Sequence, residues 1–247
     1  MSEGYSEAPT RGLPGRVAIH GAGDPHDGHS HPHHPKLQHH FDTMDQQLEA
    51  STLGMWVFLV TEIMFFGGLF MAYLVYRHAS PMGFQEASHH LNIFWGTFNT
   101  ALLIISSLTM ALAVRSAQTS QPRTTQVGWL IATMILGAGF LVVKYIEYSD
   151  KFAHHIVPGP HFQWEGIYPK PAEQFYSLYF AMTGLHAVHM VIGIGLMTVI
   201  AIMAWKRQFD GVYYTPVEVS GLYWHFVDIV WIFLFPLLYL IGRHYHG

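Results

Sequence analysis

The chain has 247 residues, of which 51% are hydrophobic and only 11% are charged, whereas a soluble domain usually carries about 25% charged residues. This composition excludes an ordinary soluble domain and indicates a membrane protein with several spans. The net charge of −4 gives no sign of nucleic-acid binding, and the lack of cysteine excludes disulfides, iron–sulfur clusters and thiolate copper sites.

The first 50 residues are rich in Gly, Pro and His, which predicts a disordered tail. Its last part, residues 41–50, is expected to form an amphipathic lead-in to the first membrane helix. Eight of the 19 histidines lie between His20 and His40, and such a tract can bind divalent metal. Because their spacing does not repeat, we interpret the tract as a solvated tail with weak, non-specific metal affinity. The candidate ligands are His29, His31, His33, His34, His39 and His40.

Five long apolar runs follow the tail, and each exceeds the ~20 residues that a transmembrane helix needs. None alternates between polar and apolar residues as a barrel strand does. The sequence therefore predicts an all-α fold, a polytopic bundle of five transmembrane helices over residues 51–247. The expected helices lie at about 52–76, 92–114, 127–148, 175–205 and 219–242.

Glycine and proline mark irregular points in these runs. Pro236 should kink the last helix near its outer end. The Pro- and aromatic-rich loop at 150–173 is expected to form an ordered cap or partner contact outside the membrane. Points where another helix can approach closely are expected at Gly67, Gly68, Gly137 and Gly139.

Five helices place the two termini on opposite sides of the membrane. Positive charge is enriched in cytoplasmic loops, and the side of the N-terminus carries seven Lys and Arg against four on the other side. We therefore expect a cytoplasmic N-terminus and a periplasmic or outer C-terminus. The seven are Arg11, Arg16, Lys36, Arg115, Arg123, Lys206 and Arg207; the four are Arg77, Lys151, Lys170 and Arg243.

The first span contains one carboxylate, Glu62, in the otherwise apolar run WVFLVTEIMFFGGLFMAY. Glu62 lies ~15 Å along the helix from Thr52, close to the midplane of a ~30 Å hydrocarbon core, where a carboxylate costs a few kcal/mol. Neighbouring aromatic rings favour its protonated form. Two interpretations stay open: an acid that exchanges protons or contacts lipid, and a neutral acid hydrogen-bonded inside the bundle.

Lys144 and Glu147 lie three residues apart near the end of the third span and share a helix face. Lys151 follows four residues after Glu147. We interpret the three as an interfacial ion-pair ladder that closes the helix end. The alternative is a site that docks a partner or a lipid headgroup.

His186 and His189 are also three residues apart, and both are expected to face toward Gly193. Paired imidazoles on a membrane helix either hydrogen-bond to other helices or ligate haem or a metal. Haem b held between helices takes one His from each of two helices, and His225 is the only other histidine within the predicted spans. Structural hydrogen bonding is therefore the favoured interpretation.

The last span carries a second polar pair, His225 and Asp228, in GLYWHFVDIVWIF. Asp228 is expected to accept a hydrogen bond from His225 or from another helix. The flanking Trp224 and Trp231 suggest a tight protein–protein seam, although packing within the chain is the default interpretation.

Several chemistries find no support in the sequence. It has no phosphate loop of the GxxxxGK type and no nucleophile–base constellation. A catalytic haem–copper subunit would need many more histidines than the three within these spans. An accessory membrane subunit or a small transporter remains, and a transporter would show paired halves or discontinuous helices.

Five motifs, in order along the chain, resemble the cytochrome c oxidase subunit III family. The last helix, YWHFVDIVWIFLFPLLYLIG, is similar to the family's C-terminal signature. The others lie in earlier helices and together extend the resemblance from about Phe41 to the end. They are TEIMFF (61–66), FNTALLIISSLTM (98–110), LGAGFLVVKYIEY (136–148) and FYSLYFAMTGLHAVHMVIG (175–193).

The resemblance implies a non-catalytic subunit beside subunits I and II of a proton-pumping respiratory oxidase in the bacterial plasma membrane. This chain would hold no cofactor, haem and copper would lie in the partner subunits, and cytochrome c would be an indirect partner. The subunit would sustain proton uptake, protect the catalytic subunit and bind phospholipid in a cleft that helps oxygen reach it. Membership of a respiratory supercomplex stays open.

The resemblance also implies residue roles. Glu62 matches the family's carbodiimide-reactive glutamate, and its role is expected to be environmental rather than catalytic. The recurrent polar positions of the helical core are matched by His186, His189, Glu218, His225 and Asp228.

The chain departs from the longer family members, which have two further helices at the start that form one wall of the lipid cleft. Five-helix members also serve quinol oxidases, and related short proteins accompany nitric oxide reductases. The motifs favour the cytochrome c branch. An alternative of another class is an independent haem-b electron carrier that uses His186, His189 or His225.

Overall fold

A computed structural model describes residues 35–160, 162–209 and 213–240 of the chain. Within these residues all regular structure is helical, as predicted. The helices are α1 (Met44–Ala79), α2 (Pro81–His89), α3 (Ile93–Gln118), α4 (Arg123–Ala153), α5 (Pro169–Trp205) and α6 (Thr215–Phe235), followed by a π-helical turn, Pro236–Leu240. Five of them are long and apolar enough to cross a membrane, which confirms the predicted five-span bundle.

The spans begin and end at other residues than the apolar runs suggest. The first begins at Met44 rather than near residue 52, so most of the expected lead-in at 41–50 belongs to α1. The side chain of Thr43 caps the helix by accepting a hydrogen bond from the backbone N–H of Gln46. Asp45 in the first turn adds a favourable interaction with the helix dipole.

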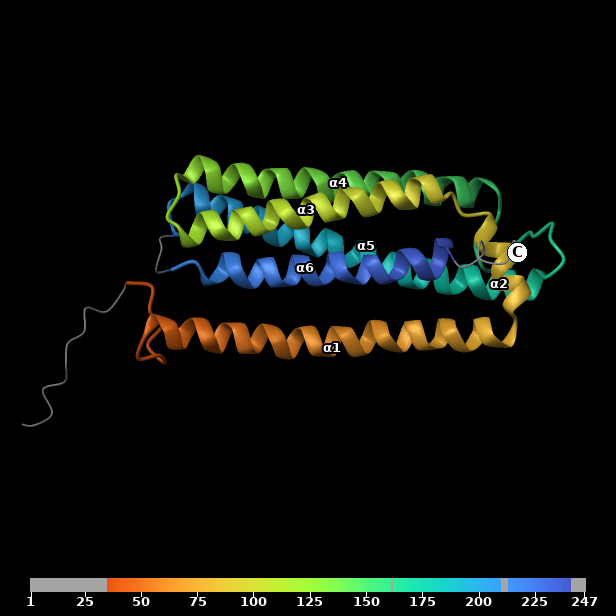
Figure 1. The fold of residues 1–247 in the computed structure, drawn as a ribbon, viewed down its shortest axis with the longest axis horizontal. Coiled ribbons are helices and arrows are strands. Elements are labelled where there is room, and N and C mark those ends of the chain that lie inside the picture. The colour runs from red at the N-terminus through yellow and green to blue at the C-terminus, as the bar shows by residue number, and fades with distance from the viewer. Residues whose placement is uncertain (1–34, 161, 210–212, 241–247) are drawn as a thin grey trace, which may run out of the picture. The chain divides into compact units, whose positions relative to one another are not determined.

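The short helix α2 was not predicted, because nine residues of mixed polarity give no spanning signal. It lies at the end of the bundle where α1 ends and α5 begins (Figure 1). Phe84 of α2 is fully buried and packs edge-on against Phe175 of α5. The expected outer loop at 150–173 is shorter than predicted, because α4 continues to Ala153 and α5 starts at Pro169.

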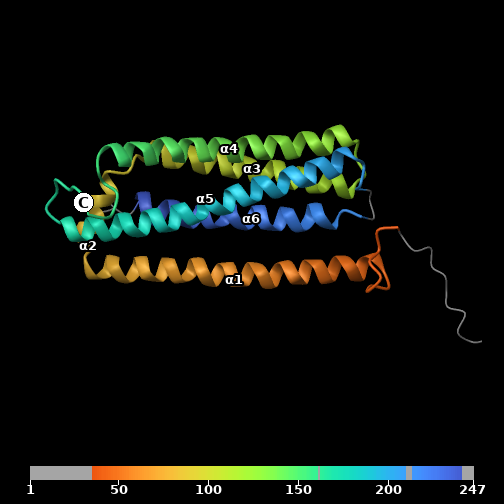
Figure 2. The same ribbon diagram turned by 180° about the vertical axis from the view of Figure 1, so that it is seen from behind.

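Helices α3, α4, α5 and α6 form a ring in which each packs against the next, and α1 packs on the outside of α5 and α6. Both views show α1 running along this side of the ring, away from α3 and α4 (Figures 1 and 2). Consecutive spans run in opposite directions, so the two ends of residues 44–240 lie at opposite ends of the bundle, as an odd number of spans requires.

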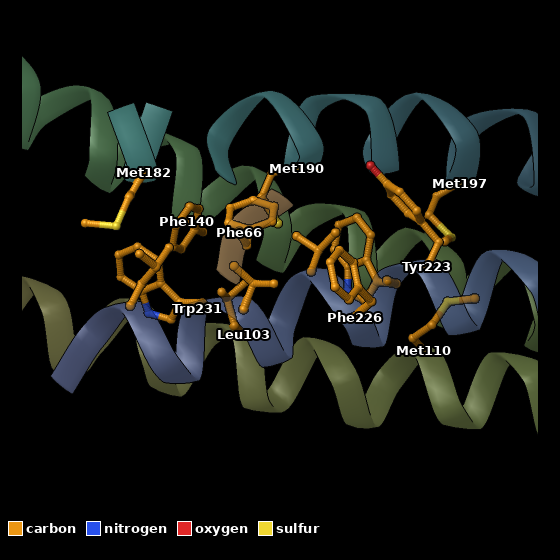
Figure 3. Close-up of a cluster of buried hydrophobic side chains, with 14 of the residues drawn as sticks. Phe66, Leu103, Met110, Phe140, Met182, Met190, Met197, Tyr223, Phe226 and Trp231 are labelled. Carbon is orange, nitrogen blue, oxygen red and sulfur yellow. The ribbon is translucent and has the colours of Figure 1, made fainter. Parts of the chain in front are cut away.

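Aromatic and methionine side chains fill the space between the helices (Figure 3). Trp224 of α6 is fully buried, and its indole lies against Gly137 of α4 and Gly193 of α5. A Cβ atom built on either glycine would come within 3 Å of this ring. The indole N–H donates to the Ser106 hydroxyl of α3 at 2.9 Å, so Trp224 contacts every other helix of the ring.

Pro236 has no backbone N–H, so it cannot make the regular helical hydrogen bond, and the last span is interrupted at this residue. Regular α-helical structure ends at Phe235, and a π-helical turn continues to Leu240. The Tyr73 hydroxyl of α1 donates to the carbonyl of Leu237 at 2.6 Å. This bond ties α1 to the irregular end of the last span.

Candidate functional site

The polar residues predicted within the spans do not gather at one centre. The structure places them in four separate surroundings: a pair between α1 and α5, an ion-pair cluster near the ends of α4 and α6, a single buried histidine in the core, and a polar strip between α3 and α6. Each is built below from its own contacts.

The first surrounding is a pair formed by Glu62 of α1 and His189 of α5. Glu62 Oε2 lies 3.2 Å from His189 Nε2, and the two side chains are 19% and 12% exposed. The other ring nitrogen, Nδ1, lies 2.9 Å from the carbonyl oxygen of Leu185. The hydrogen bond that sequence reasoning left open for Glu62 is therefore made to another helix.

The carbonyl of Leu185 decides the protonation of this pair. A carbonyl oxygen only accepts, so Nδ1 of His189 must carry a proton. A single proton is then left for the contact between Nε2 and Oε2. It resides either on His189, giving an ion pair, or on Glu62, giving two neutral groups.

Aromatic side chains cover the pair. The ring of Phe66 lies 5.4 Å from that of His189, and the Tyr223 hydroxyl donates to the His189 carbonyl at 3.0 Å. The Phe66 ring also lies 6.3 Å from that of Phe226 of α6, and Figure 3 shows both side chains among the core residues.

The second surrounding holds Lys144 and Glu147, which form the ion pair that their spacing indicates, at 2.9 Å. Lys144 and Glu147 are buried between the helices, with 3% and 6% of their surface exposed. Tyr239 donates to Glu147 Oε1 at 2.5 Å, and Lys144 donates to the hydroxyls of Tyr239 and Tyr179 at 2.8 and 3.3 Å. The ammonium also lies 4.8 Å from the centre of the Trp231 ring.

The expected ladder does not continue to Lys151. Its ammonium donates instead to the His90 carbonyl at 3.0 Å and lies 3.7 Å from Asp150. Glu147 is satisfied by Lys144 and by Tyr239 of the π-helical turn. The cluster therefore joins α4 to the end of the last span, and sequence spacing within α4 could not reveal that.

His186 and His189 diverge, contrary to the expectation that both face one way. The ring of His186 is fully buried against Phe140 of α4 and Trp231 of α6, at centroid distances of 5.2 and 5.3 Å. Neither of its nitrogens has a hydrogen-bond partner among the described residues. Residues three apart on a helix point about 60° away from each other. At this position that difference is enough to place His186 in the core and His189 in the seam with α1.

The fourth surrounding is the strip between α3 and α6. His225 Nδ1 lies 2.7 Å from the Ser107 hydroxyl of α3, so of the two partners expected for Asp228, His225 or a residue of another helix, His225 is engaged elsewhere. Asp228 is 3% exposed and lies beside Ser107, yet neither of its carboxyl oxygens has a well-formed hydrogen bond among the described residues. Glu218 lies further along α6 in a depression that also includes Arg115 of α3.

The tryptophans beside this strip do not form an outer seam. Trp224 and Trp231 are fully buried inside the chain, where their indole N–H groups donate to Ser106 and Thr100. The protein–protein seam that their presence suggested is therefore the chain's own core.

Within the part of the chain that the structure describes, no three His, Asp or Glu side chains converge as metal ligands would. The rings of His39 and His40 lie beside each other, 3.5 Å between centroids. The other four tail candidates, His29, His31, His33 and His34, lie outside the described residues.

The residues that sequence reasoning missed are mainly hydroxyl groups: Ser107, Tyr179, Tyr223 and Tyr239. Each contacts a predicted polar residue from a different helix. Ser and Tyr are common in membrane helices, so nothing in the sequence marks these four. Only the packing of the helices identifies them.

An apolar groove of about 430 Å³ runs between α1 and α6. Its lining includes Leu59, Phe66 and Phe70 of α1 and Phe226 and Phe233 of α6, with His225 as its polar edge. Gly67 also lines the groove, and a Cβ atom there would meet nothing within 4 Å. The expectation of close helix packing at Gly67 and Gly68 is therefore wrong, whereas that at Gly137 is confirmed.

Comparison with known proteins gives one consistent result. The family model for cytochrome c oxidase subunit III matches residues 37–243. The chain is 32% identical over 203 residues to quinol oxidase subunit 3 of Bacillus subtilis, covering 81% of this chain and 92% of that protein. It is 29% identical over 214 residues to a probable quinol oxidase subunit 3 of Staphylococcus epidermidis, covering 85% and 100%.

The match covers all five spans and the described polar surroundings, and the predicted family is confirmed. The cytochrome c branch, which the motifs favoured, is not confirmed by the names of these relatives. The chain is a multi-pass membrane protein that belongs to the cytochrome c oxidase subunit III family of the haem–copper oxidases.

Proposed function

We propose that this chain is the non-catalytic subunit III of a bacterial respiratory terminal oxidase, which reduces oxygen and pumps protons. Subunits I and II would be its partners and would hold the haem and copper. The observation that carries the proposal is the family match over residues 37–243, which includes every span. The divergent directions of His186, His189 and His225 also favour this function over an independent haem-b carrier, which needs two facing imidazoles.

The electron donor of the complex is either quinol or cytochrome c. The names of the relatives favour quinol, and we adopt quinol as the proposed donor, with cytochrome c as the alternative. Oxygen consumption by the purified complex, with a soluble quinol or with reduced cytochrome c as donor, separates the two.

Co-purification tests the function as a whole. A tagged copy of the chain, extracted from its own membranes in mild detergent, should bring down a haem-bearing catalytic subunit. A complex without such a subunit would contradict the proposal. A Soret band on the isolated polypeptide would instead favour the haem-b carrier.

Within this complex we assign the Glu62–His189 pair a supporting role in proton uptake. The pair joins a carboxyl group to an imidazole within the spans, and both side-chain types can exchange protons. Glu62→Gln keeps the size and hydrogen-bonding capacity of the side chain but removes the exchangeable proton.

The first prediction concerns this variant. The Glu62→Gln complex should assemble with an unchanged visible spectrum, lose labelling by carbodiimide, and show slower proton uptake or a shorter working life during turnover. The matched control is Glu165→Gln, because Glu165 lies at an exposed loop position. Glu147→Gln is unsuitable as a control, because Glu147 is part of the buried ion pair. Unchanged proton uptake and lifetime in Glu62→Gln would remove the functional role of the pair.

We also propose that a membrane phospholipid occupies the groove between α1 and α6 with an acyl chain. The groove is almost wholly apolar and lies beside exposed residues of α1 such as Ile63. The longer family members have two further helices, and lipid in this groove would cover apolar surface that α1 leaves open.

A further inference from the structure

One tyrosine of the last span, Tyr239, differs from the other buried tyrosines in what its hydroxyl contacts. It donates to the carboxylate of Glu147 at 2.5 Å. The buried hydroxyls of Tyr73, Tyr176 and Tyr223 donate instead to backbone carbonyls. A carbonyl oxygen accepts a hydrogen bond but is too weak a base to take the proton, whereas a carboxylate can take it. Of these four phenols, Tyr239 is therefore the one with a proton acceptor in contact.

This contact matters for one-electron chemistry. A phenol that loses an electron becomes a strong acid, so the electron leaves readily only where the proton can leave as well. Both oxygens of Glu147 accept hydrogen bonds, from Tyr239 and from Lys144, as those of an ionised carboxylate do. Loss of an electron would thus give a neutral Tyr239 radical and a neutral Glu147. Because Lys144 then lacks its buried counter-ion, this state is unfavourable, and the electron and the proton are drawn back together.

Tyr239 begins a row of oxidisable rings that leads out of the core. The hydroxyls of Tyr239 and Tyr179 both accept from the Lys144 ammonium, at 2.8 and 3.3 Å. The Tyr179 ring lies 6.2 Å from that of Tyr176, which lies 5.9 Å from Trp164. Trp164 is a half-buried residue of the loop between α4 and α5, and it lines an open polar groove of about 730 Å³. We call these four rings the aromatic string, and it connects the buried Tyr239 to a water-facing surface.

On its other side Tyr239 contacts Trp231, with 6.5 Å between ring centroids. Trp231 lies among the buried core residues (Figure 3), and its indole N–H donates to Thr100, a half-buried residue of α3, at 3.1 Å. The Lys144 ammonium lies 4.8 Å from the centre of the Trp231 ring, and like charges disfavour a positive charge on that ring. An oxidised Trp231 is therefore expected to take an electron from Tyr239, which can lose its proton.

We propose that Tyr239 is a redox-active tyrosine. An oxygen-derived one-electron oxidant, released when oxygen reduction in the catalytic subunit is incomplete, takes an electron from Tyr239 by way of Trp231, and the phenolic proton moves to Glu147. A soluble reductant at the loop surface then returns one electron through the aromatic string, and the proton moves back from Glu147 to Tyr239. One electron leaves and one enters, so the chain is unchanged while the oxidant is reduced.

Photo-oxidation of the isolated full chain tests the radical. The chain has no cysteine, so Ile232→Cys, at an exposed position next to Trp231, can carry a single ruthenium photosensitiser. A flash in the presence of an electron acceptor turns this label into a one-electron oxidant. Electron paramagnetic resonance of samples frozen after the flash should then show a tyrosyl radical.

Fluorine labelling identifies which tyrosine carries the radical without removing its hydroxyl. Difluorotyrosine in place of Tyr239 should add fluorine splitting to the spectrum. Difluorotyrosine in place of Tyr73, an equally buried tyrosine that donates to a carbonyl, should add none. The absence of a tyrosyl radical, a radical without splitting from position 239, or equal splitting from both positions would overturn the proposal.

Two further variants test the proton acceptor and the route. Lys144→Met/Glu147→Leu removes the acceptor without leaving a lone buried charge, so most of the radical should be lost while the helical circular dichroism is kept. Trp164→Phe replaces the outer ring of the aromatic string, so ascorbate added after the flash should reduce the radical more slowly. Trp205→Phe, at the other end of α5, is the matched control and should leave this rate unchanged. Full radical yield in the double variant, or equal decay in the two Trp variants, would contradict the proposal.

The source of the oxidant rests on the proposed function, whereas the photochemistry needs only the isolated chain, so the two can fail separately. If the chain brings down no haem-bearing catalytic subunit, the proposed function is wrong whatever the flash experiment shows. If it brings down that subunit but no radical forms on Tyr239, only this inference is wrong. In the complex with difluorotyrosine at position 239, the fluorine-split radical should also appear during oxygen consumption, and its absence there would overturn the assigned source of the oxidant.

Discussion

The buried ion pair of this protein combines a neighbour in sequence with partners on other helices. Lys144 shows this clearly, because its ammonium is surrounded by Glu147 of its own helix and by hydroxyl groups of Tyr179 and Tyr239. A charge in this position tolerates no loss of its counter-ion, since hydrocarbon and packed rings cannot replace it.

The second prediction concerns this ion pair. Glu147→Leu leaves the ammonium of Lys144 buried without its counter-ion and should destabilise the chain by about 3–5 kcal/mol. The double variant Lys144→Met/Glu147→Leu removes both charges and should recover much of this loss. Thermal unfolding of the purified full chain in detergent measures both. A double variant less stable than Glu147→Leu would show that the pair does not act as one unit.

Spacing within one helix predicted the bond between Lys144 and Glu147, because residues three apart share a face. It could not predict the hydroxyl of Tyr239, which comes from a turn 92 positions away. It also misled for His186 and His189, since which side of a helix faces the core depends on how the neighbouring helices pack. The contact between Lys144 and Glu147 could thus be predicted from the sequence, but partners across helices could not.

At the scale of the element, the helices are held together by large rings set against small residues. Trp224 of α6 lies against Gly193 of α5 and Gly137 of α4. Gly195, two positions along α5, has open space where a Cβ atom would lie. Two glycines of one helix therefore have opposite packing requirements, although the sequence around them is uniformly apolar.

The third prediction uses this contrast. Gly193→Ala forces a methyl group into the Trp224 ring, at about 2.9 Å, and should destabilise the chain by about 1–3 kcal/mol. Gly195→Ala should leave stability unchanged or raise it by up to about 1 kcal/mol, since Ala favours a helix over Gly. Thermal unfolding of the two variants side by side measures the difference. Equal melting temperatures would show that the Trp224 contact is not tight.

The number and order of spans could be predicted because each span is a long apolar run, which is a strong signal. The ends of α1, α4 and α5 lie several residues beyond the apolar runs, because polar residues at the membrane surface continue the helix. The helix α2 has no such run and was missed. Hydropathy therefore identifies the apolar part of each span, whereas the polar residues that lengthen α1, α4 and α5 depend on local contacts that hydropathy does not describe.

At the scale of the whole molecule, the ring of α3 to α6 differs from α1. Helix α6 is the most buried span and α1 the least. One side of α1 packs on α5 and α6, and exposed residues such as Met64 and Met71 cover much of the rest. Among the described residues, that remaining side of α1 is therefore the largest apolar surface that no other helix of the chain covers along a whole span.

The fourth prediction concerns orientation. The side with more Lys and Arg should face the cytoplasm, and the chain has no cysteine, so single cysteines can be labelled without background. Gln118→Cys, at the end of α3 on the N-terminal side, should be protected from an impermeant thiol reagent in intact cells. Glu165→Cys, in the loop between α4 and α5, should be labelled. The reverse pattern would show that the N-terminus lies outside.

The last prediction concerns the groove between α1 and α6, where the proposed lipid would lie. Gly67 lines this groove and Gly68 does not, and neither glycine is in contact with another helix. Gly67→Leu should therefore fill part of the groove and reduce the phospholipid that co-purifies with the complex. Gly68→Leu adds the same side chain to the same helix on a different face, so its lipid content should match that of the unmodified complex. Mass spectrometry of the extracted lipids measures both. Leu is apolar and favours a helix, so neither substitution should disturb α1 itself. A loss of lipid confined to Gly67→Leu would show that lipid occupies the groove. Equal lipid in the two variants would mean that the groove is empty or is covered by a partner helix.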